Sequence, residues 1–364
     1  MKIGILGAGQ LGRMLALAGY PLNLDFVFLD PAASACAAPL GEHLHADYSD
    51  QHALAEFCAR IDMATYEFEN VPIAAAEFVA QRVPLMPGAQ ALAACQDRLI
   101  EKQLFDQLSI PVPAYAAVSS LEQLRDAVAR IGLPCVLKTR RFGYDGKGQA
   151  VLREADDIAT AWERLGEHEL ILEAFVAFER ELSIIAVRGR DGGCAYYPVV
   201  ENQHHEGILR SSIPQAADPM QALAETHIGK ALSHLQYVGV MAFEFFVLDG
   251  TLYANEIAPR VHNSGHWSIE GAECSQFENH LRAVAGLPLG STALRGHSCM
   301  LNCIGVAPDT AALAAIPGLH VHHYGKRAKP QRKVGHLTIT AEQAEHLQQR
   351  REAALAILGR AGSD

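Results

Sequence analysis

The chain has 364 residues, of which 49% are hydrophobic and 20% charged, and its formal net charge is -11. This length allows two or three domains with buried cores, and the composition is that of a globular protein. The negative charge argues against a surface that binds the nucleic-acid backbone, although a local basic cluster can still hold a small phosphate ester. We therefore expect small anions as ligands and no nucleic-acid partner.

The cysteine pattern indicates a reducing compartment, and the hydropathy indicates a protein without a membrane span. Eight cysteines are scattered through apolar segments without any C-x-x-C pair, which favours reduced thiols over a zinc site. The start, "MKIGILGAG", lacks the layout of a signal peptide, and no apolar run reaches the roughly 18 residues of a membrane span. We expect a cytoplasmic protein that does not associate with membranes.

The first hundred residues predict alternating strands and helices. An apolar helical pattern at residues 10–22 separates two short apolar strands, which is typical of a βαβ unit with a parallel sheet. The predicted strands of this region are 2–9, 25–30, 43–49 and 61–69, and its predicted helices are 10–22, 50–60 and 72–81. A long helix predicted at 89–108 ends before Pro111 and Pro113, so a domain boundary is expected near residue 98.

The rest of the chain predicts a small α+β unit followed by a region rich in strands. The small unit has helices at 120–131 and 155–165 and strands at 134–138 and 150–153, joined by a glycine-rich loop. The later strands are predicted at 169–176, 180–189, within 194–214, on both sides of Asp249-Gly250, at 297–306 and at 320–325. Helices are predicted at 219–236 and 341–358.

The opening loop "GILGAGQLG" has a phosphate-binding pattern. Gly7, Gly9 and Gly12 spell G-x-G-x-x-G after a predicted strand, and Asp30 stands where a ribose-binding acid of a dinucleotide site belongs. Glycines and a helix N-terminus can equally hold any other phosphate, because the backbone N–H groups and the helix dipole favour any anion. A tight turn without a ligand is the third interpretation.

A second glycine-rich loop, "KTRRFGYDGKGQ", connects two predicted strands. Gly143, Gly146 and Gly148 lie close to Lys138 and Lys147, which suits a flap that covers a polyphosphate. It is not a Walker A loop, because no Ser or Thr follows the Gly-Lys pair and no helix follows the loop. A surface hairpin with solvated charges is the alternative.

Two acidic residues, Glu244 and Glu256, lie on neighbouring predicted strands. Carboxylates that meet on one sheet face need a cation, and Mg²⁺ bridging nucleotide phosphates fits this need. A two-residue Asp249-Gly250 loop would point Glu256 to the opposite face, so we predict a three-residue loop with a bulge at Gly250. An exposed acidic pair is the alternative.

The next segment, "APRVHNSGHWS", carries polar groups suited to small anions. Arg260 can hold an oxyanion by bidentate hydrogen bonds, and Asn263 can orient a sugar or a base edge. The pattern alone does not decide which of His204, His262 and His266 are functional. A later basic cluster between residues 326 and 333 is either a receptor for a phosphate monoester or a solvated hairpin.

Taken in order, these motifs resemble the ATP-grasp superfamily, and within it the 5-(carboxyamino)imidazole ribonucleotide synthetases. The segments that carry the resemblance are "GAGQLGRML", "DRLIEKQLF", "GYDGKGQ", "QYVGVMAFEFFV", "NEIAPRVHNSGHW" and "RKVGHL". The resemblance implies an α/β and α+β fold: a Rossmann-like pre-ATP-grasp domain at 1–98, an ATP-grasp domain at 99–290 and a C-terminal domain at 291–364. The ATP-grasp domain would comprise a small flap lobe at 111–170 and a larger lobe at 171–290.

The same resemblance implies the reaction and the site. ATP, bicarbonate and 5-aminoimidazole ribonucleotide would react through carboxyphosphate, with Mg²⁺ or alternatively Mn²⁺, in a homodimer. The implied ATP-binding residues are Arg98, Lys138, Gly143, Tyr144, Asp145, Gly146, Lys147, Gly148, Gln149, Glu173, Ala174, Phe175, Val176, Glu181, His204, Asn255 and Glu256. Glu244 and Glu256 would be the metal ligands. The implied ribonucleotide site comprises Gln10, Leu11, Glu67, Glu69, Asn263, Ser264, Lys326, Arg332 and Lys333, and the implied catalytic residues are Arg260, Lys138, Tyr144, Asp145, His262 and Asn263.

One position departs from the superfamily pattern, and three other functions stay open. Ala258 stands where related enzymes often have an asparagine, with Asn255 as a substitute metal ligand. The alternatives are another ATP-grasp ligase such as a formate-using transformylase or a biotin carboxylase, an NAD-dependent dehydrogenase, and a nonenzymatic nucleotide sensor. The dehydrogenase reading leaves the two glutamates and the flap unexplained.

Overall fold

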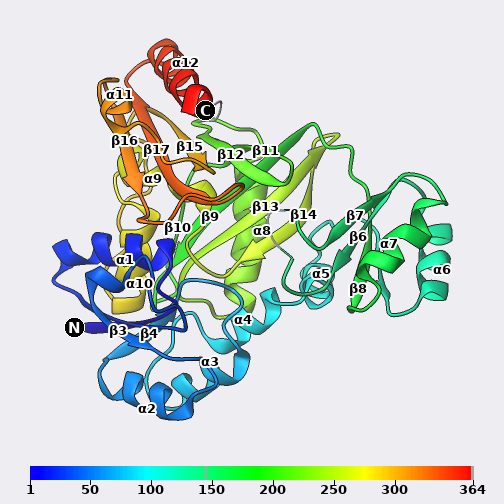
Figure 1. The fold of residues 1–364 in the computed structure, drawn as a ribbon, viewed down its shortest axis with the longest axis horizontal. Helices are drawn as coiled ribbons and strands as arrows, with labels where there is room; N and C mark the ends of the chain where they lie inside the picture. Colours follow the sequence, from blue (N-terminus) through cyan, green and yellow to red (C-terminus); the bar gives the residue numbers. More distant parts are fainter. Residues whose placement is uncertain (144–145, 362–364) are drawn as a thin grey trace.

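The computed structural model describes residues 1–143 and 146–361, among which three β-sheets form (Figure 1). Tyr144 and Asp145, both predicted site residues, lie outside the described residues. Among the described helices, none is long and apolar enough to cross a lipid bilayer.

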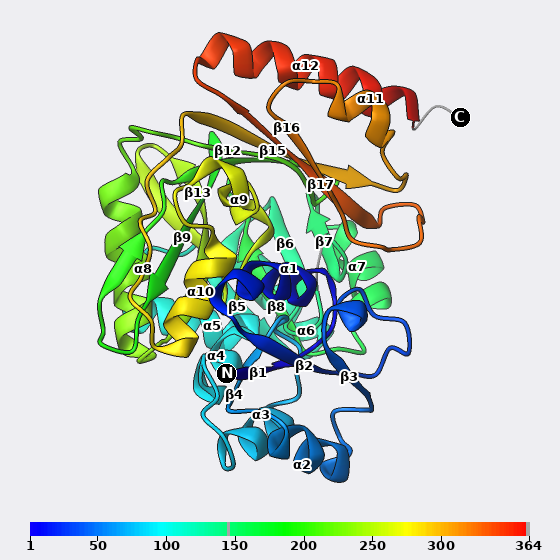
Figure 2. The ribbon, with the colours of Figure 1, turned by 90° about the vertical axis from the view of Figure 1, so that its left-hand side faces the viewer.

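The N-terminal sheet is parallel, with strand order β3-β2-β1-β4, as the βαβ pattern predicts. Its strands are β1 (Lys2–Leu6), β2 (Asp25–Asp30), β3 (Glu42–His45) and β4 (Met63–Tyr66), and its helices are α1 (Gln10–Gly19), α2 (Gln51–Ala59) and α3 (Ile73–Ala80). Short 3-10 turns lie at Tyr20–Leu22 and Ala38–Leu40. Alternate residues of β2 pack into two different cores, because α1 covers one face of the sheet and α2 and α3 cover the other (Figure 2).

The predicted helix at 89–108 is instead two helices, α4 (Ala89–Cys95) and α5 (Arg98–Gln107). Asp97 separates them with an extended backbone, and its carboxylate accepts a hydrogen bond from the Leu99 N–H at 3.0 Å. This is an N-cap, which supplies a partner for one of the free N–H groups that every helix start exposes. The same carboxylate binds Arg140 of the small lobe at 2.7 Å, so the start of α5 is tied to that lobe.

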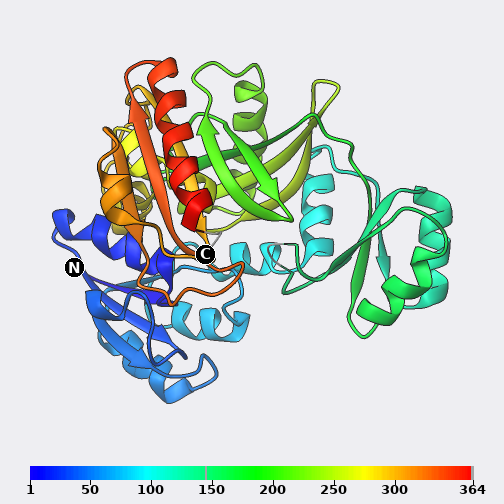
Figure 3. The same cartoon turned by 45° about the horizontal axis from the view of Figure 1, so that its top comes forward.

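The small lobe is an antiparallel sheet with strand order β5-β8-β6-β7 and two covering helices. Its elements are β5 (Tyr115–Val118), α6 (Leu121–Ile131), β6 (Cys135–Thr139), β7 (Gln149–Leu152), α7 (Asp157–Leu165) and β8 (Leu170–Ala174). Figure 3 shows this lobe projecting to one side of the molecule. The glycine-rich loop connects β6 to β7, as predicted, and Lys138 pairs with Gln149 where the two strands enter it.

The large sheet has the order β14-β13-β9-β11-β12-β15-β17-β16, with β10 paired to β9. Its strands are β9 (Arg180–Arg188), β10 (Cys194–Tyr196), β11 (Val200–His205), β12 (Ile208–Pro214), β13 (Gly239–Leu248), β14 (Thr251–Ala258), β15 (His297–Ile304), β16 (Leu319–His323) and β17 (Lys333–Ala341). The accompanying helices are α8 (Gln221–His234), α9 (Ser268–Gly271), α10 (Gln276–Ala285), α11 (Thr310–Ala314) and α12 (Ala344–Ala361), with a 3-10 turn at Asn263–Gly265.

The C-terminal strands β15 to β17 extend this sheet, because β15 pairs with β12. Figure 2 shows α12 lying along their outer side, and apolar side chains of α12 and of these strands share one core. β17 was not predicted from the sequence, and it begins at Lys333, the last residue of the basic segment. Nor was α10 predicted, which packs against β13 and α1 and so joins the N-terminal domain to the large sheet.

Candidate active site

The predicted site residues converge on a cavity of about 690 Å³ that is lined by the large sheet, the small lobe, and helices and loops of the N-terminal domain. The predicted residues that line it are Gln10, Leu11, Glu67, Glu69, Arg98, Lys138, Gly143, Gly146, Lys147, Gln149, Glu181, His204, Glu244, Asn255, Glu256, Arg260, His262, Asn263 and Lys333. Among the described residues, the predicted ones outside this lining are Gly148, Glu173, Ala174, Phe175, Val176, Ser264, Lys326 and Arg332. Most of the predicted site therefore surrounds one space.

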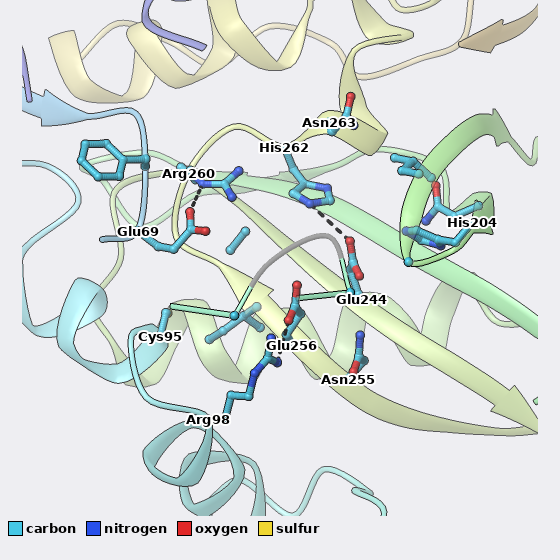
Figure 4. A pocket seen from close by; sticks show the side chains of 18 of the residues that line it. Glu69, Cys95, Arg98, His204, Glu244, Asn255, Glu256, Arg260, His262 and Asn263 are labelled. Atoms are coloured by element: carbon cyan, nitrogen blue, oxygen red, sulfur yellow. Dashed lines mark hydrogen bonds and ion pairs between the residues drawn. The ribbon is translucent and has the colours of Figure 1, made fainter. Parts of the chain in front are cut away.

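Two carboxylates face each other at the centre of this space. Glu244 of β13 pairs in register with Glu256 of β14, and Figure 4 shows both side chains pointing the same way. The strands are joined by a two-residue turn in which Asp249 and Gly250 both have positive φ, 49° and 72°. This is the geometry that favours Asp-Gly in tight hairpins, so the predicted three-residue loop with a bulge at Gly250 is wrong.

The bulge that aligns the two acids lies five residues after Gly250, at Asn255. Phe245 pairs with Ala254 while Glu244 pairs with Glu256, which leaves Asn255 as the extra residue of β14. An extra residue shifts the alternation of the strand by one position. Glu256 therefore lies on the cavity face instead of in the core.

Each carboxylate has one positively polarised partner (Figure 4). Arg98 donates to Glu256 at 2.9 Å, and the His262 Nε2 lies 3.2 Å from a Glu244 oxygen. Burial lowers the pKa of His262 well below its usual value, so its ring is neutral. Because Nδ1 of His262 accepts the Ser264 N–H, the ring proton is on Nε2, facing Glu244.

The acidic pair fits a divalent cation. Burial, and then the charge of Glu256, raise the pKa of Glu244 to about 7. The neighbouring positive groups therefore do not fully compensate the negative charge of the two carboxylates. Carboxylate oxygens are the ligands that Mg²⁺ prefers. Within the described part of the chain no group of three or more His, Cys, Asp or Glu residues could hold a metal ion, so phosphate oxygens and water would complete the coordination. Asn255 lines the cavity beside the pair, whereas the Ala258 side chain offers no ligand atom.

Lys138, where β6 enters the glycine-rich loop, is held by a buried carboxylate. Its Nζ lies 3.1 Å from Glu173, which is 3% exposed, and Lys102 lies 3.5 Å from the same oxygen. Burial acts to raise the pKa of Glu173, but the nearby cations, Lys138 first, outweigh it and lower the pKa to about 2. The Glu173 side chain, predicted to bind ATP, therefore binds these lysines and does not line the cavity.

The glycine loop at residues 7–12 holds an anion, and that anion is a side chain of the protein. The buried Glu67 carboxylate accepts hydrogen bonds from the N–H of Gly12 at 2.6 Å and from the N–H of Gly9. A Cβ atom at Gly7 or Gly9 would lie 2.5 Å from Glu67, which explains both glycines. Asp30 accepts the Ala8 N–H at 2.8 Å. The dinucleotide interpretation is therefore wrong. The N–H groups of the glycine loop bind Glu67, and Asp30, the expected ribose-binding acid, binds the Ala8 N–H.

Glu69 binds Arg260 (Figure 4). The Arg260 Nε donates to Glu69, whose carboxylate joins the N-terminal domain to the segment after β14. Burial raises the pKa of Glu69, but Arg260 outweighs it and lowers the pKa to about 2, so Glu69 is ionised. Glu69, predicted to contact the ribonucleotide, instead holds the arginine predicted to bind an oxyanion.

The segment after Arg260 contains Asn263, whose side chain has no partner among the described residues, and Ser264, which is bonded within the protein. Both polar side-chain atoms of Asn263 are buried against the cavity with no hydrogen-bond partner among the described residues, which suits a ligand contact. Ser264 is fully buried, and its Oγ accepts a hydrogen bond from Ser183 at 2.8 Å, so it supports the loop from within. His266 is buried beside Gln276.

The remaining predicted residues lie on β9 and β11 or in the basic segment that leads into β17. His204 of β11 pairs with Glu181 of β9, and both line the cavity next to Glu244. In the basic segment, Lys326 donates to the Gln10 side chain. Lys333 lines the cavity near this contact, and Arg332 donates to a backbone carbonyl of its own loop at 3.3 Å.

Sequence reasoning missed the residues of α5 that support the site. Glu101 and Lys102 are 2% and 1% exposed and contact β14 directly. Their spacing from Arg98 is i+3 and i+4, which places all three on one face of a helix. This spacing could have predicted that Glu101 and Lys102 lie beside Arg98 at the site.

Family comparisons agree with this geometry. The chain matches an ATP-grasp domain at residues 103–277, a ribonucleotide synthetase preATP-grasp domain at 1–96, and a phosphoribosylaminoimidazole carboxylase C-terminal domain at 298–350. The protein is thus an ATP-grasp ligase, and the resemblance inferred from the sequence motifs is confirmed.

Comparison with individual proteins shows to which family of ATP-grasp ligases the chain belongs. An N5-carboxyaminoimidazole ribonucleotide synthase of Pseudomonas aeruginosa is 57% identical over 350 residues, covering 96% of this chain and 97% of that protein. The crystal structure of the Thermus thermophilus synthetase is 51% identical with a TM-score of 0.93, covering 99% of this chain and 98% of that one. The Aspergillus clavatus synthase, solved with ADP and 5-aminoimidazole ribonucleotide, is 32% identical with a TM-score of 0.91 and the same coverage. The chain belongs to the N5-carboxyaminoimidazole ribonucleotide synthase family.

We predict that Glu67→Gln destabilises the N-terminal domain. The substitution replaces one accepting oxygen by an NH₂ group, so one buried backbone N–H of the glycine loop loses its acceptor, which costs about 1–3 kcal/mol. Urea unfolding followed by tryptophan fluorescence and circular dichroism measures the loss. The control is Glu77→Gln on the exposed side of α3, which should leave stability within about 0.5 kcal/mol. Equal stability of the two variants would contradict the role of Glu67.

Proposed function

We propose that the chain carboxylates 5-aminoimidazole ribonucleotide in purine biosynthesis. In this reaction ATP phosphorylates bicarbonate to carboxyphosphate, and the amine takes up the carboxyl group to give N5-carboxyaminoimidazole ribonucleotide, ADP and phosphate. The observation that carries the proposal is that one cavity contains both the Glu244–Glu256 pair and Arg260, the arginine fixed by Glu69. A nucleotide-binding module needs the first feature only, whereas a ligase that activates a small oxyanion needs both.

The nucleotide would lie between the small lobe and the large sheet. Lys138 and Arg98 would contact its phosphates, Glu181 and His204 would lie near its sugar, and the loop from Gly143 to Gln149 would cover it. Positive groups fixed in advance at these positions stabilise the charge that develops on a transferred phosphoryl group. Mg²⁺ bound by Glu244 and Glu256 would supply further neutralisation of phosphate charge.

Bicarbonate would bind to Arg260, on the side of the carboxylate pair nearest the N-terminal domain. Bicarbonate is a poor electrophile, so its phosphorylation must precede transfer of the carboxyl group. Arg260 donates from Nε to Glu69 and from one terminal nitrogen to the Val261 carbonyl at 3.1 Å, so the other terminal nitrogen would bind the oxyanion. Closure over the cavity would keep water away from carboxyphosphate, which hydrolyses readily.

The ribonucleotide would bind where the N-terminal domain meets the C-terminal basic segment. The Gln10 side chain is linked to Lys326, and Lys333 lines the same cavity, so a phosphate monoester would meet positive charge there. Asn263 lines this cavity, and its two polar side-chain atoms have no hydrogen-bond partner among the described residues, so it would orient the imidazole or the ribose. The Aspergillus clavatus complex, which contains both ADP and 5-aminoimidazole ribonucleotide, supports two adjoining sites.

Three further points complete the proposal. The eight free thiols favour the cytoplasm, where thiols stay reduced. A homodimer is proposed on the resemblance to the family. Mg²⁺ is proposed as the metal, with Mn²⁺ as a substitute.

The proposed function predicts that release of ADP from ATP depends on both other substrates. Coupled spectrophotometric assays with ATP and Mg²⁺ should show fast ADP formation only when bicarbonate and 5-aminoimidazole ribonucleotide are both present. Carbon-13 bicarbonate should appear in the product at N5 of the ribonucleotide, as observed by NMR. ADP release that ignores both substrates would contradict the proposal, and so would carboxylation of biotin or consumption of formate.

A second prediction concerns Arg260. Arg260→Ala should lower kcat/KM for bicarbonate by about 10²–10³-fold, because a fixed donor to the reacting oxyanion is lost. Glu69→Gln should lower it by about 10-fold, because the arginine keeps its charge but loses its orientation. Steady-state kinetics with varied bicarbonate measures both. The control is Glu278→Gln, which breaks a Glu–Arg pair on α10 and should change nothing. An unchanged bicarbonate dependence in Arg260→Ala would overturn the assignment.

A further inference from the structure

The bulge in β14 decides on which face Glu256 lies. Leu252 and Ala254 point into the core, and two residues past the bulge Ile257 does so again. In a regular strand Glu256 would share the face of Ala254, because side chains alternate. The extra residue, Asn255, reverses this alternation, so the position of the second acid depends on whether the bulge is kept.

Two buried side chains of α5 bind the backbone around this bulge. The Lys102 Nζ donates to the carbonyl oxygens of Ala254 at 3.0 Å and of Asn255 at 2.8 Å. The Glu101 carboxylate accepts the N–H of Ile257 at 2.7 Å. Neighbouring side chains thus take up backbone groups on both sides of Glu256.

These contacts are costly to build, which points to a specific role. Burying an ammonium or a carboxylate is unfavourable unless hydrogen bonds replace its water. An apolar residue would fill the space between α5 and the sheet without this penalty. Lys102 also lies 3.5 Å from Glu173, the carboxylate that holds Lys138, so one buried cation supports both the acidic strand and the lysine of the phosphate site.

We propose that Lys102 and Glu101 are positioning residues, which fix the bulge at Asn255 and thereby hold Glu256 opposite Glu244. The proposal rests on the proposed function in that the aligned acids are taken to serve a divalent cation and ATP. Arg98 is the third residue on this face of α5 and contacts Glu256 itself. The helix therefore carries a residue of the site and, one turn later, the two residues that orient the strand.

The test compares Lys102→Met with a matched variant, Lys230→Met. Lys230 of α8 also donates to two backbone carbonyls, those of Leu108 at 2.9 Å and Ser109 at 3.3 Å, but it does so outside the cavity. Hydrogen exchange of the Tyr253–Ile257 segment, followed by mass spectrometry on the protein alone, reports on the bulge without any substrate. Exchange in this segment should be at least about 10-fold faster in Lys102→Met and unchanged in Lys230→Met. The reason is that only Lys102 donates to the backbone of this segment.

Metal binding and kinetics separate positioning from general stability. Titration with Mn²⁺ alone, followed by electron paramagnetic resonance, should show about 10–100-fold weaker binding in Lys102→Met, the range for lost supporting contacts. The KM for ATP should rise at least about 10-fold, while the KM for 5-aminoimidazole ribonucleotide stays within about twofold. Lys230→Met should match the wild type in all three quantities, even where its melting temperature falls equally.

Each outcome decides between the two claims. If Lys102→Met exchanges as slowly as the wild type at residues 253–257, or binds Mn²⁺ with wild-type affinity, the positioning role is overturned. This holds whatever activity the enzyme shows. Wild-type protein that forms no ADP in the presence of all substrates overturns the proposed function, while the exchange measurement still decides the bulge. If Lys102→Met fails to fold, Glu101→Met takes its place, because it removes the acceptor of the Ile257 N–H. Faster exchange is again expected at Ile257, and wild-type exchange there overturns the proposal.

Discussion

The register between β13 and β14 is the constraint on which the rest of the site depends. Two acids on neighbouring strands are useful only if both face the cavity, and a shift of one residue sends one of them into the core. The chain meets this requirement with a tight Asp249-Gly250 turn and a separate bulge at Asn255. Bulges commonly re-aim side chains near active sites, and this one turns Glu256 toward Glu244.

The groups that stabilise this pair come from every part of the fold. Arg98 reaches Glu256 from α5, and His262 reaches Glu244 from the segment after β14. Glu69 of the N-terminal domain fixes Arg260 of the same segment. The cavity therefore lies where α5, the segment after β14 and the N-terminal domain bring charged groups together. This explains why a chain with a net charge of -11 concentrates buried cations here.

Much of this arrangement was predictable from sequence, because local patterns are strong. Periodicity and short motifs predicted the βαβ start, the glycine-rich loop between β6 and β7, the acidic hairpin and the loop containing Arg260. The failures concern pairings between distant segments. Local spacing cannot show that Glu67 fills the loop of Gly9 and Gly12, since the partners are more than fifty residues apart. The bulge at Asn255 is likewise held by Glu101 and Lys102 of α5, which are more than 150 residues away in the sequence.

The central claim is that the bulged register makes Glu244 and Glu256 joint ligands of one metal site next to bound nucleotide. Crystals grown with ADP and Mn²⁺ test it most directly, by anomalous scattering at the manganese edge. The account predicts an anomalous peak between the two carboxylates, with oxygen ligands at about 2.0–2.3 Å, and Asn255 as the extra residue of β14. A peak elsewhere in the cavity, or a regular β14 with Glu256 turned into the core, would contradict it.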